Sequence, residues 1–193
     1  MSERRRGAEL ERAILDAAWL ELVEQGFNGL TMERVALRAG TSRPVLARRW
    51  SSKVELSVAA IRQQMEQYPL AVPDRGDLRT ELLEFLDRAS KRSTGIAIAF
   101  SLIASEYFAE SATTPDELRA TLTEKEPIVL PVIFERGIER GEIERRRLTP
   151  VVASLPGDLF RHYVVMNFAA PSEALRREWV DEIFLPLVRV TKN

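Results

Sequence analysis

Helical spacing of the apolar residues dominates this chain and most constrains its fold. Apolar side chains recur at intervals of three or four residues almost everywhere, and alternating strand patterns are absent. Every break in the spacing contains glycine, proline or a residue type that caps helices. The sequence therefore predicts an all-α fold, with four helices before residue 69 and five after it.

Capping residues set the expected boundaries of the first four helices. These residues are Gly26 at the end of the first helix, Thr31 and Gly40 around the second, Ser42 before the third, and Ser52 with Glu55 as a capping box before the fourth. The fourth helix is expected to run towards Tyr68. The stretch from Pro69 to Gly76 cannot continue a helix and is the predicted domain boundary.

The five later helices are expected over residues 78–91, 95–110 and 114–140, from Pro150 after its cap Thr149, and from Ser172 onwards. Pro127 and Pro131 are expected to kink the helix over 114–140. The last helix carries an apolar stripe with a spacing of four, made of Leu175, Trp179, Ile183 and Leu187. The predicted organisation is an N-terminal domain over residues 1–56, a connector helix to residue 68, and a C-terminal domain over residues 69–193.

Composition excludes several classes of protein. The chain has no cysteine and a single histidine, His162, so we expect neither a transition-metal site nor any other cofactor. No signal-peptide core follows the N-terminal arginines, and the longest apolar run, over residues 95–104, is much shorter than the roughly 20 residues of a membrane helix. Motifs of hydrolases, phosphate-binding loops and metalloproteases are absent. We expect a cytoplasmic protein that is not an enzyme.

The second and third expected helices form a helix-turn-helix. A short helix that ends at Gly40, a turn and a second short helix with basic residues are the arrangement that places one helix in the major groove of DNA. The stretch from Arg43 to Lys53 includes Arg48 and Arg49 and contains no acidic residue, which favours contact with phosphates.

The residues of this unit agree with a longer signature at fixed spacing. The matching positions are Ile14-Leu-Asp-Ala-Ala18, Gly26-Phe27, Leu30-Thr31-Met32, Val35-Ala36-Leu-Arg-Ala39-Gly40-Thr41-Ser42, Leu46, Trp50, Ser52-Lys53 and Leu56. In this pattern the chain resembles the TetR family of bacterial transcriptional regulators. The resemblance implies a homodimer with a nine-helix, two-domain fold, in which helices two and three read double-stranded operator DNA. It also implies a C-terminal domain that binds a small molecule and dimerises.

Some positions that would touch DNA differ from the family. The family usually has Gly and then Thr at the positions of Pro44 and Val45, Tyr at Ala47, and His or Tyr at Arg49. Ala47 cannot make the phosphate contact of that tyrosine, and Arg49 is expected to replace it electrostatically.

A helical arrangement at about 100° per residue places Arg48 opposite the buried Leu46 and Trp50. Pro44 and Val45 flank Arg48, and Ala47 and Arg49 lie towards the edges. An exposed arginine can pair with guanine, and small apolar side chains can contact a thymine methyl group. The expected DNA-contacting residues are Thr31, Thr41, Ser42, Arg43, Pro44, Val45, Ala47, Arg48, Arg49 and Lys53. Arg4, Arg5 and Arg6 form either a solvated tail or a basic arm on DNA.

Two further sets of residues are expected in the C-terminal half. A largely apolar effector would bind among Phe85, Phe100, Ile103, Tyr107, Phe134, Phe160, His162 and Tyr163. A homodimer would form through the last two helices, by Leu155, Leu159, Val164, Ile183, Phe184 and Leu187. Most of the aromatic side chains have an alternative role as ordinary core residues. The alternative function is a DNA-organising or protein-interaction dimer of the same fold that binds no small effector.

Overall fold

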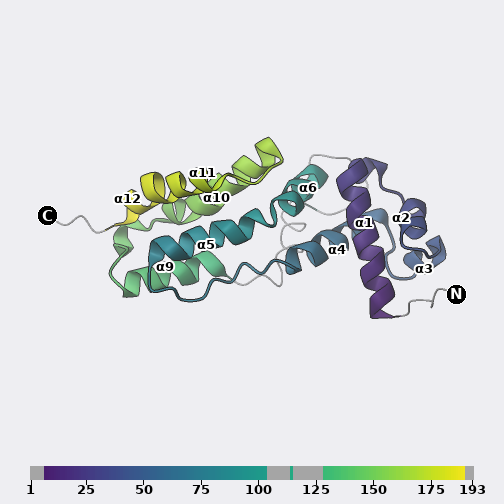
Figure 1. Cartoon of the computed structure of the whole chain (residues 1–193), viewed down its shortest axis with the longest axis horizontal. Helices are drawn as coiled ribbons and strands as arrows, with labels where there is room; N and C mark the ends of the chain where they lie inside the picture. The colour runs from purple at the N-terminus through teal and green to yellow at the C-terminus, as the bar shows by residue number, and fades with distance from the viewer. Residues whose placement is uncertain (1–6, 104–113, 115–127, 190–193) are drawn as a thin grey trace. The chain divides into compact units, whose positions relative to one another are not determined.

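The computed structural model describes residues 7–103, 114 and 128–189, and within these ranges the chain forms helices and no strand (Figure 1). The all-α prediction is confirmed. Contacts divide the chain into two compact units. The first contains the residues up to Gln67 together with the end of helix α6 from Ile98 onwards, and the second begins at Tyr68. None of the helices in the described ranges has the length and apolar character needed to cross a membrane.

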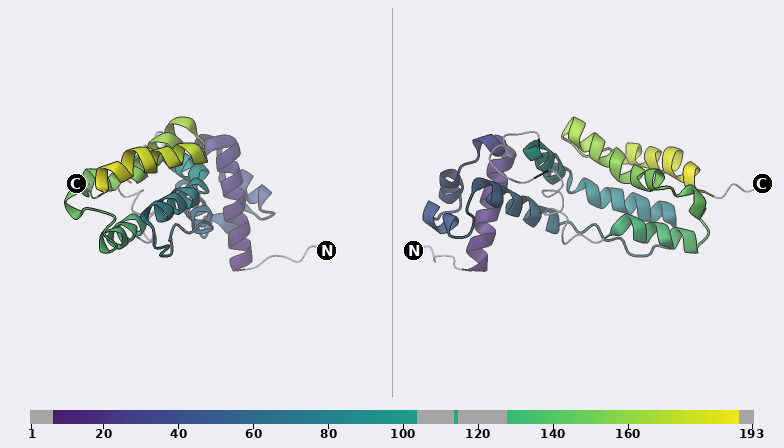
Figure 2. Two further views of the ribbon diagram at one scale, coloured as in Figure 1. Left: turned by 60° about the vertical axis from the view of Figure 1, so that its left-hand side comes forward. Right: turned by 180° about the vertical axis from the view of Figure 1, so that it is seen from behind.

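The first unit is built on helices α1 (Ala8–Gly29), α2 (Met32–Arg38), α3 (Arg43–Ala47) and α4 (Lys53–Glu66). Helix α1 packs against α2 and α4, and α2 packs against α3. Figures 1 and 2 show α2 and α3 together on one side of α1. The core of the unit collects the apolar stripe of α1 with buried residues of the other helices, among them Leu22, Val35, Leu46, Trp50 and Leu56.

Local capping explains the short helices of this unit. The Thr31 hydroxyl oxygen accepts a hydrogen bond from the Arg34 backbone N–H, at 3.2 Å, and so caps α2. Gly40 has a φ of 67° at the other end, where its own N–H donates to Leu37 and the Thr41 N–H donates to Ala36. This pair of bonds is a Schellman motif, and the left-handed backbone at its centre favours glycine. The predicted boundaries of α2 are confirmed.

Two other predicted boundaries differ in detail. Gly26 has the expected positive φ, but it kinks α1 and the helix resumes until Gly29. Ser52 caps α4 as predicted, because its hydroxyl oxygen accepts from the Glu55 N–H. The reciprocal bond of a capping box is absent from this site, since the Glu55 carboxylate accepts from the backbone N–H of Ser51 and not from that of Ser52.

The second unit contains α5 (Leu78–Ser90), the start of α6 (Ser93–Ile103), α9 (Val129–Glu139), the 3₁₀ turn η1 (Arg145–Arg147) and α10 (Pro150–Asn167). It ends with one long helical segment made of α11 (Glu173–Glu178), the π-helical η2 (Trp179–Phe184) and α12 (Leu185–Val188). Helix α5 packs against α9, α11 and η2, and α10 packs against η2. In Figures 1 and 2 these helices lie side by side as a bundle.

The prediction of one kinked helix over residues 114–140 is wrong. Ile128 has φ −74° and ψ 93°, which is extended backbone, so α9 begins only at Val129. Pro131 lies in the first turn of α9, where the missing N–H of a proline removes no hydrogen bond. This proline therefore lies at the start of a helix and does not kink a longer one. Pro127 lies outside the described residues.

The spacing of four in the last helical segment is also wrong, by a single residue. Leu185 donates its N–H to the carbonyl of Val180, five residues earlier, which is the hydrogen bond of a π-helix. The buried residues of this segment are Trp179, Val180, Phe184, Leu185 and Val188, so the buried face leaves the predicted stripe after Trp179. Ile183 and Leu187, predicted as part of the stripe, are 38% and 43% exposed.

Candidate DNA interface

A buried carboxylate fixes helix α2 against helix α1. Glu21 of α1 is buried, and its oxygens lie 2.9 Å from Nε of Arg34 and 2.9 Å from Nε of Arg38. Arg38 also donates to both carboxylate oxygens of Glu24, and these hydrogen bonds hold the pKa of Glu24 below its ordinary value. Two charged groups of α2 are thus held by one face of α1, which orients α2, the helix that precedes α3.

Leu46 and Trp50 anchor the short helix α3 in the core. Leu46 is fully buried, Trp50 nearly so, and the Trp50 N–H donates to the Leu46 carbonyl at 2.9 Å. Regular helix ends at Ala47, and Arg48 keeps a right-handed helical backbone as its C-terminal cap. Pro44 lies in the first turn and is exposed. The core positions predicted from the spacing are therefore found where expected, although the helix is shorter.

Arg48, the C-terminal cap residue of α3, is exposed and has no acidic partner in the part of the chain that the structure describes. Its side chain has no ion-pair or hydrogen-bond partner within residues 7–103 and 128–189. Arg43 and Arg49 differ, because each is held by an acid. Arg43 Nε lies 2.7 Å from Oε1 of Glu33 in α2, and the Arg49 guanidinium pairs with the carboxylate of Glu11 in α1.

The other residues expected at DNA lie around this surface with different exposure. Ala47 and Ser42 are exposed, and Thr31 is exposed while its oxygen caps α2. Thr41 is half-buried. Lys53, also half-buried, places Nζ 4.5 Å from the centre of the Phe27 ring, in a cation–π contact.

Val45, expected beside Arg48, is half-buried and packs against the core cluster of the unit. Its N–H donates to the Ser42 carbonyl at 2.9 Å in the first turn of α3.

Comparison with protein families agrees with this geometry. Residues 14–60 match the family of bacterial regulatory proteins called tetR, and residues 72–183 match the tetracyclin repressor-like C-terminal domain. The second match alone covers more than half of the chain. The chain belongs to the TetR family. TetR-family regulators are DNA-binding proteins that act as dimers and are not enzymes, so the predictions of family, fold class and a non-enzymatic DNA-binding regulator are confirmed.

Individual relatives of this TetR-family chain have low sequence identity to it but match it over most of their length. An HTH-type transcriptional regulator of Mycobacterium tuberculosis is 27% identical over 86% of this chain and 81% of its own length. The DNA-binding transcriptional repressor TetR of Mycobacteroides abscessus is 24% identical over 95% of this chain and 96% of its own. Among solved structures, the fatty acid degradation regulator FadR of Bacillus halodurans has a TM-score of 0.66 at 15% identity, covering 94% of this chain and 97% of its own. These likenesses support the shared two-domain fold.

The residues expected around an effector in this TetR-family chain are only partly brought together. Phe85, Phe134 and Phe160 are buried in the core cluster of the second unit, where the Phe134 ring stacks on Phe184 with 5.3 Å between centroids. Tyr163 is half-buried and makes an edge contact with Trp179. His162 is exposed on α10 and does not join this cluster. Three of the expected residues do not belong to the described part of the second unit. Phe100 is half-buried in the first unit, the Ile103 side chain is not described, and Tyr107 lies outside the described residues.

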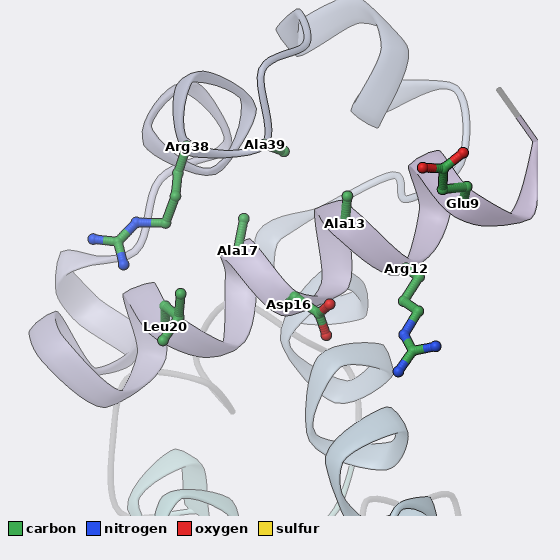
Figure 3. A pocket seen from close by; sticks show the side chains of 8 residues that line it. All are labelled: Glu9, Arg12, Ala13, Asp16, Ala17, Leu20, Arg38 and Ala39. Atoms are coloured by element: carbon green, nitrogen blue, oxygen red, sulfur yellow. The ribbon is translucent and has the colours of Figure 1, made fainter. Parts of the chain in front are cut away.

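A hollow of about 380 Å³ lies in the first unit, and none of these aromatic side chains lines it (Figure 3). It is lined by α1 and the end of α2. Alanine and leucine side chains of Ala13, Ala17, Leu20 and Ala39 share it with the charged groups of Glu9, Arg12, Asp16 and Arg38.

The residues expected at a dimer interface fall into three groups. Val164 and Phe184 are fully buried inside the second unit, so their side chains belong to the subunit core. Leu155 and Leu159 are half-buried on α10, and Ile183 and Leu187 are exposed on the last helical segment. Sequence reasoning missed three large apolar side chains that are more exposed than any of these, Val151, Met166 and Phe168. Phe168 has a positive φ of 50° at the C-terminal end of α10, a signal that only the structure carries.

Proposed function

We propose that this chain is a homodimeric repressor that binds a pseudo-palindromic operator through α3 and is released by a small, largely apolar effector. The observation that carries the DNA-reading part is the isolated charge of Arg48. It is exposed, it has no partner in the described residues of the unit, and it directly follows a helix whose opposite side is anchored by Leu46 and Trp50. In a helix-turn-helix this is the position from which a side chain reaches base edges.

Two arginines that are adjacent in sequence have different roles under this proposal. Arg48 contacts a base, so Arg48→Ala weakens operator binding by about 1–3 kcal/mol and flattens the preference at one base pair in each half-site. Arg49 contacts phosphate, so Arg49→Ala weakens operator and random DNA alike. It also lowers the slope of log affinity against log salt by about one. Lys53→Ala has the same effect as Arg49→Ala.

The experiment first selects the operator from random DNA with the purified protein. Operator and random duplexes are then titrated with each variant at several salt concentrations. If Arg48→Ala weakens both DNAs equally while Arg49→Ala relaxes the base preference, the placement of α3 in the groove is wrong.

The dimer of this proposal uses the exposed apolar side chains of α10 and of the segment from α11 to α12. Ile183 and Leu187 supply one part and half-buried Leu155 and Leu159 the other. Because two-fold symmetry of the protein is mirrored in the DNA, two equal half-sites are expected. Light scattering at micromolar concentration tests this part, and a mass equal to the 21.9 kDa of one chain refutes it.

The effector site of this proposal lies among the aromatic residues of the second unit. Phe85, Phe134 and Phe160 share one apolar core, which suits an apolar ligand that opens space beside them. Such a ligand lowers operator affinity only by favouring a dimer conformation in which the two helix-turn-helix units no longer match the spacing of the half-sites. Small apolar molecules that raise the melting temperature are titrated against the operator complex. If ligands bind and the operator Kd never changes, the alternative of a dimer without an effector is supported.

A further inference from the structure

Two acidic residues form ion pairs with arginines of the surface that is proposed to contact DNA. Glu11 lies in the first turn of α1 and pairs with Arg49, which is 38 residues away in sequence. Glu33 lies in the first turn of α2 and pairs with Arg43. Both acids belong to helices other than the one that carries the arginine at DNA. The described part of the reading surface therefore holds paired and unpaired cations side by side.

The two pairs differ in how strongly water weakens them. In the Arg43–Glu33 pair the side chains are 65% and 62% exposed, and in the Arg49–Glu11 pair they are 35% and 48% exposed. Exposed ion pairs are weak because water and salt screen them, and partial burial reduces this screening. Glu11 is therefore the stronger competitor for an arginine on this surface.

A phosphate that contacts Arg49 must displace the Glu11 carboxylate. We propose that Glu11 is an affinity-limiting residue that competes with DNA phosphate for Arg49. This inference rests on the proposed role of Arg49 at phosphate. A phosphate of operator or random DNA that binds Arg49 must break the pair with Glu11, and the cost of breaking it is subtracted from the affinity for both DNAs. Glu11 therefore lowers both affinities by a similar factor.

The structure offers a matched control for Glu11. Glu9 lies in the same first turn of α1, so both residues have the same favourable interaction with the helix N-terminus. Its carboxylate has no ion-pair partner within residues 7–103 and 128–189, and it lines the hollow of Figure 3. The difference between Glu11→Gln and Glu9→Gln therefore isolates the competition for Arg49 from the loss of one negative charge near DNA.

The test titrates random and operator duplexes with wild type, Glu11→Gln and Glu9→Gln over a range of salt concentrations. Relative to Glu9→Gln, Glu11→Gln is expected to bind random DNA roughly three- to tenfold more tightly, with a log–log salt slope steeper by about one. The operator affinity is expected to rise by a similar factor, so the ratio of operator to random affinity changes little. Glu33→Gln changes these quantities less than Glu11→Gln does, because its pair is more exposed.

The same comparison is repeated in an Arg49→Ala background. There the Glu11→Gln and Glu9→Gln variants are expected to bind random DNA equally, since no arginine remains to be released. A difference that persists without Arg49 overturns the proposal, and so does equal binding by the two variants when Arg49 is present. If Arg48→Ala and Arg49→Ala act as expected while Glu11→Gln matches Glu9→Gln, only the role of Glu11 fails. If neither arginine variant changes DNA binding, the proposed reading surface and this inference fail together.

Discussion

A methyl group added at Gly137 tests how tightly the second unit is packed. Gly137 lies in α9, and an added Cβ would stand 3.0 Å from Cδ1 of Ile143, 3.2 Å from its Cγ1 and 3.3 Å from Cδ1 of Leu78. Both neighbours are buried. The backbone is held as well, because the N–H groups of Glu142 and Ile143 both donate to the Gly137 carbonyl. Neither the neighbouring side chains nor the backbone can therefore move easily to make room for an added methyl group.

The change in the free energy of unfolding expected for Gly137→Ala is the sum of two opposed effects. Replacing glycine by alanine inside a helix stabilises it by about 1 kcal/mol. Overpacking a buried contact costs about 1–3 kcal/mol. We expect Gly137→Ala to be destabilising by up to about 2 kcal/mol. Ile143→Val removes Cδ1, the nearest atom, and by itself costs about 0.5–1.5 kcal/mol. The double variant is expected to be more stable than the sum of the single effects by about 1 kcal/mol, because the alanine methyl then has space.

Urea unfolding at fixed protein concentration measures the four free energies, since dimer formation makes stability depend on concentration. Gly141→Ala is the control in the same segment. Gly141 has a φ of 73° and nothing within 4 Å of an added Cβ, so alanine there strains the backbone without touching Ile143. This control should not couple to Ile143→Val. A Gly137→Ala variant that is more stable than wild type and does not couple to Ile143→Val would refute the packing argument.

Two further predictions concern carboxylates of α5. Glu81 is fully buried, with Arg136 at 3.3 Å and Arg140 at 3.2 Å, so Glu81→Gln should lower the free energy of unfolding by about 2–4 kcal/mol, measured by urea titration. An unchanged midpoint and slope would exclude a structural role for these pairs. Hydrogen bonds from Arg75 lower the pKa of Glu84 to about 2, so its stabilising effect is present above its ordinary pKa of 4.5 and is lost as the pH falls towards 2. Glu84→Gln should therefore lower the free energy of unfolding by about 1 kcal/mol at pH 7. The effect is small because Arg75 is partly exposed and water screens the pair. Near pH 2 the variant and wild type should have nearly the same stability. A stability difference that is constant over this pH range would contradict the assignment.

The sequence was a good guide where structure depends on neighbouring residues. The caps at Thr31, Gly40 and Thr149 involve groups within a few positions of one another, and each was predicted correctly. The buried positions Leu46 and Trp50 followed from helical spacing alone. These features need no knowledge of the rest of the fold.

Features that depend on distant residues could not be predicted in this way. The pairing of Arg49 with Glu11 joins the turn after α3 to helix α1, and no local pattern marks Glu11 as its partner. Val45 packs partly against the core cluster of the first unit, a contact that a helical wheel of α3 alone does not predict. The extended backbone at Ile128 was not predicted, because spacing alone does not distinguish a kinked helix from a new helix that begins at Val129.

The π-helical turn in η2 amounts to a single additional residue in the last helical segment. An extra residue advances everything after it by about 100° around the helix axis, yet the core still receives Phe184 and Val188 in place of Ile183 and Leu187. The subunit core keeps its apolar character, while the outward face receives different side chains. A one-residue insertion or deletion here can thus change the outward-facing side chains of the segment while the buried positions keep apolar residues. Alignments with relatives that lack the π-helical turn should therefore place a one-residue gap near η2.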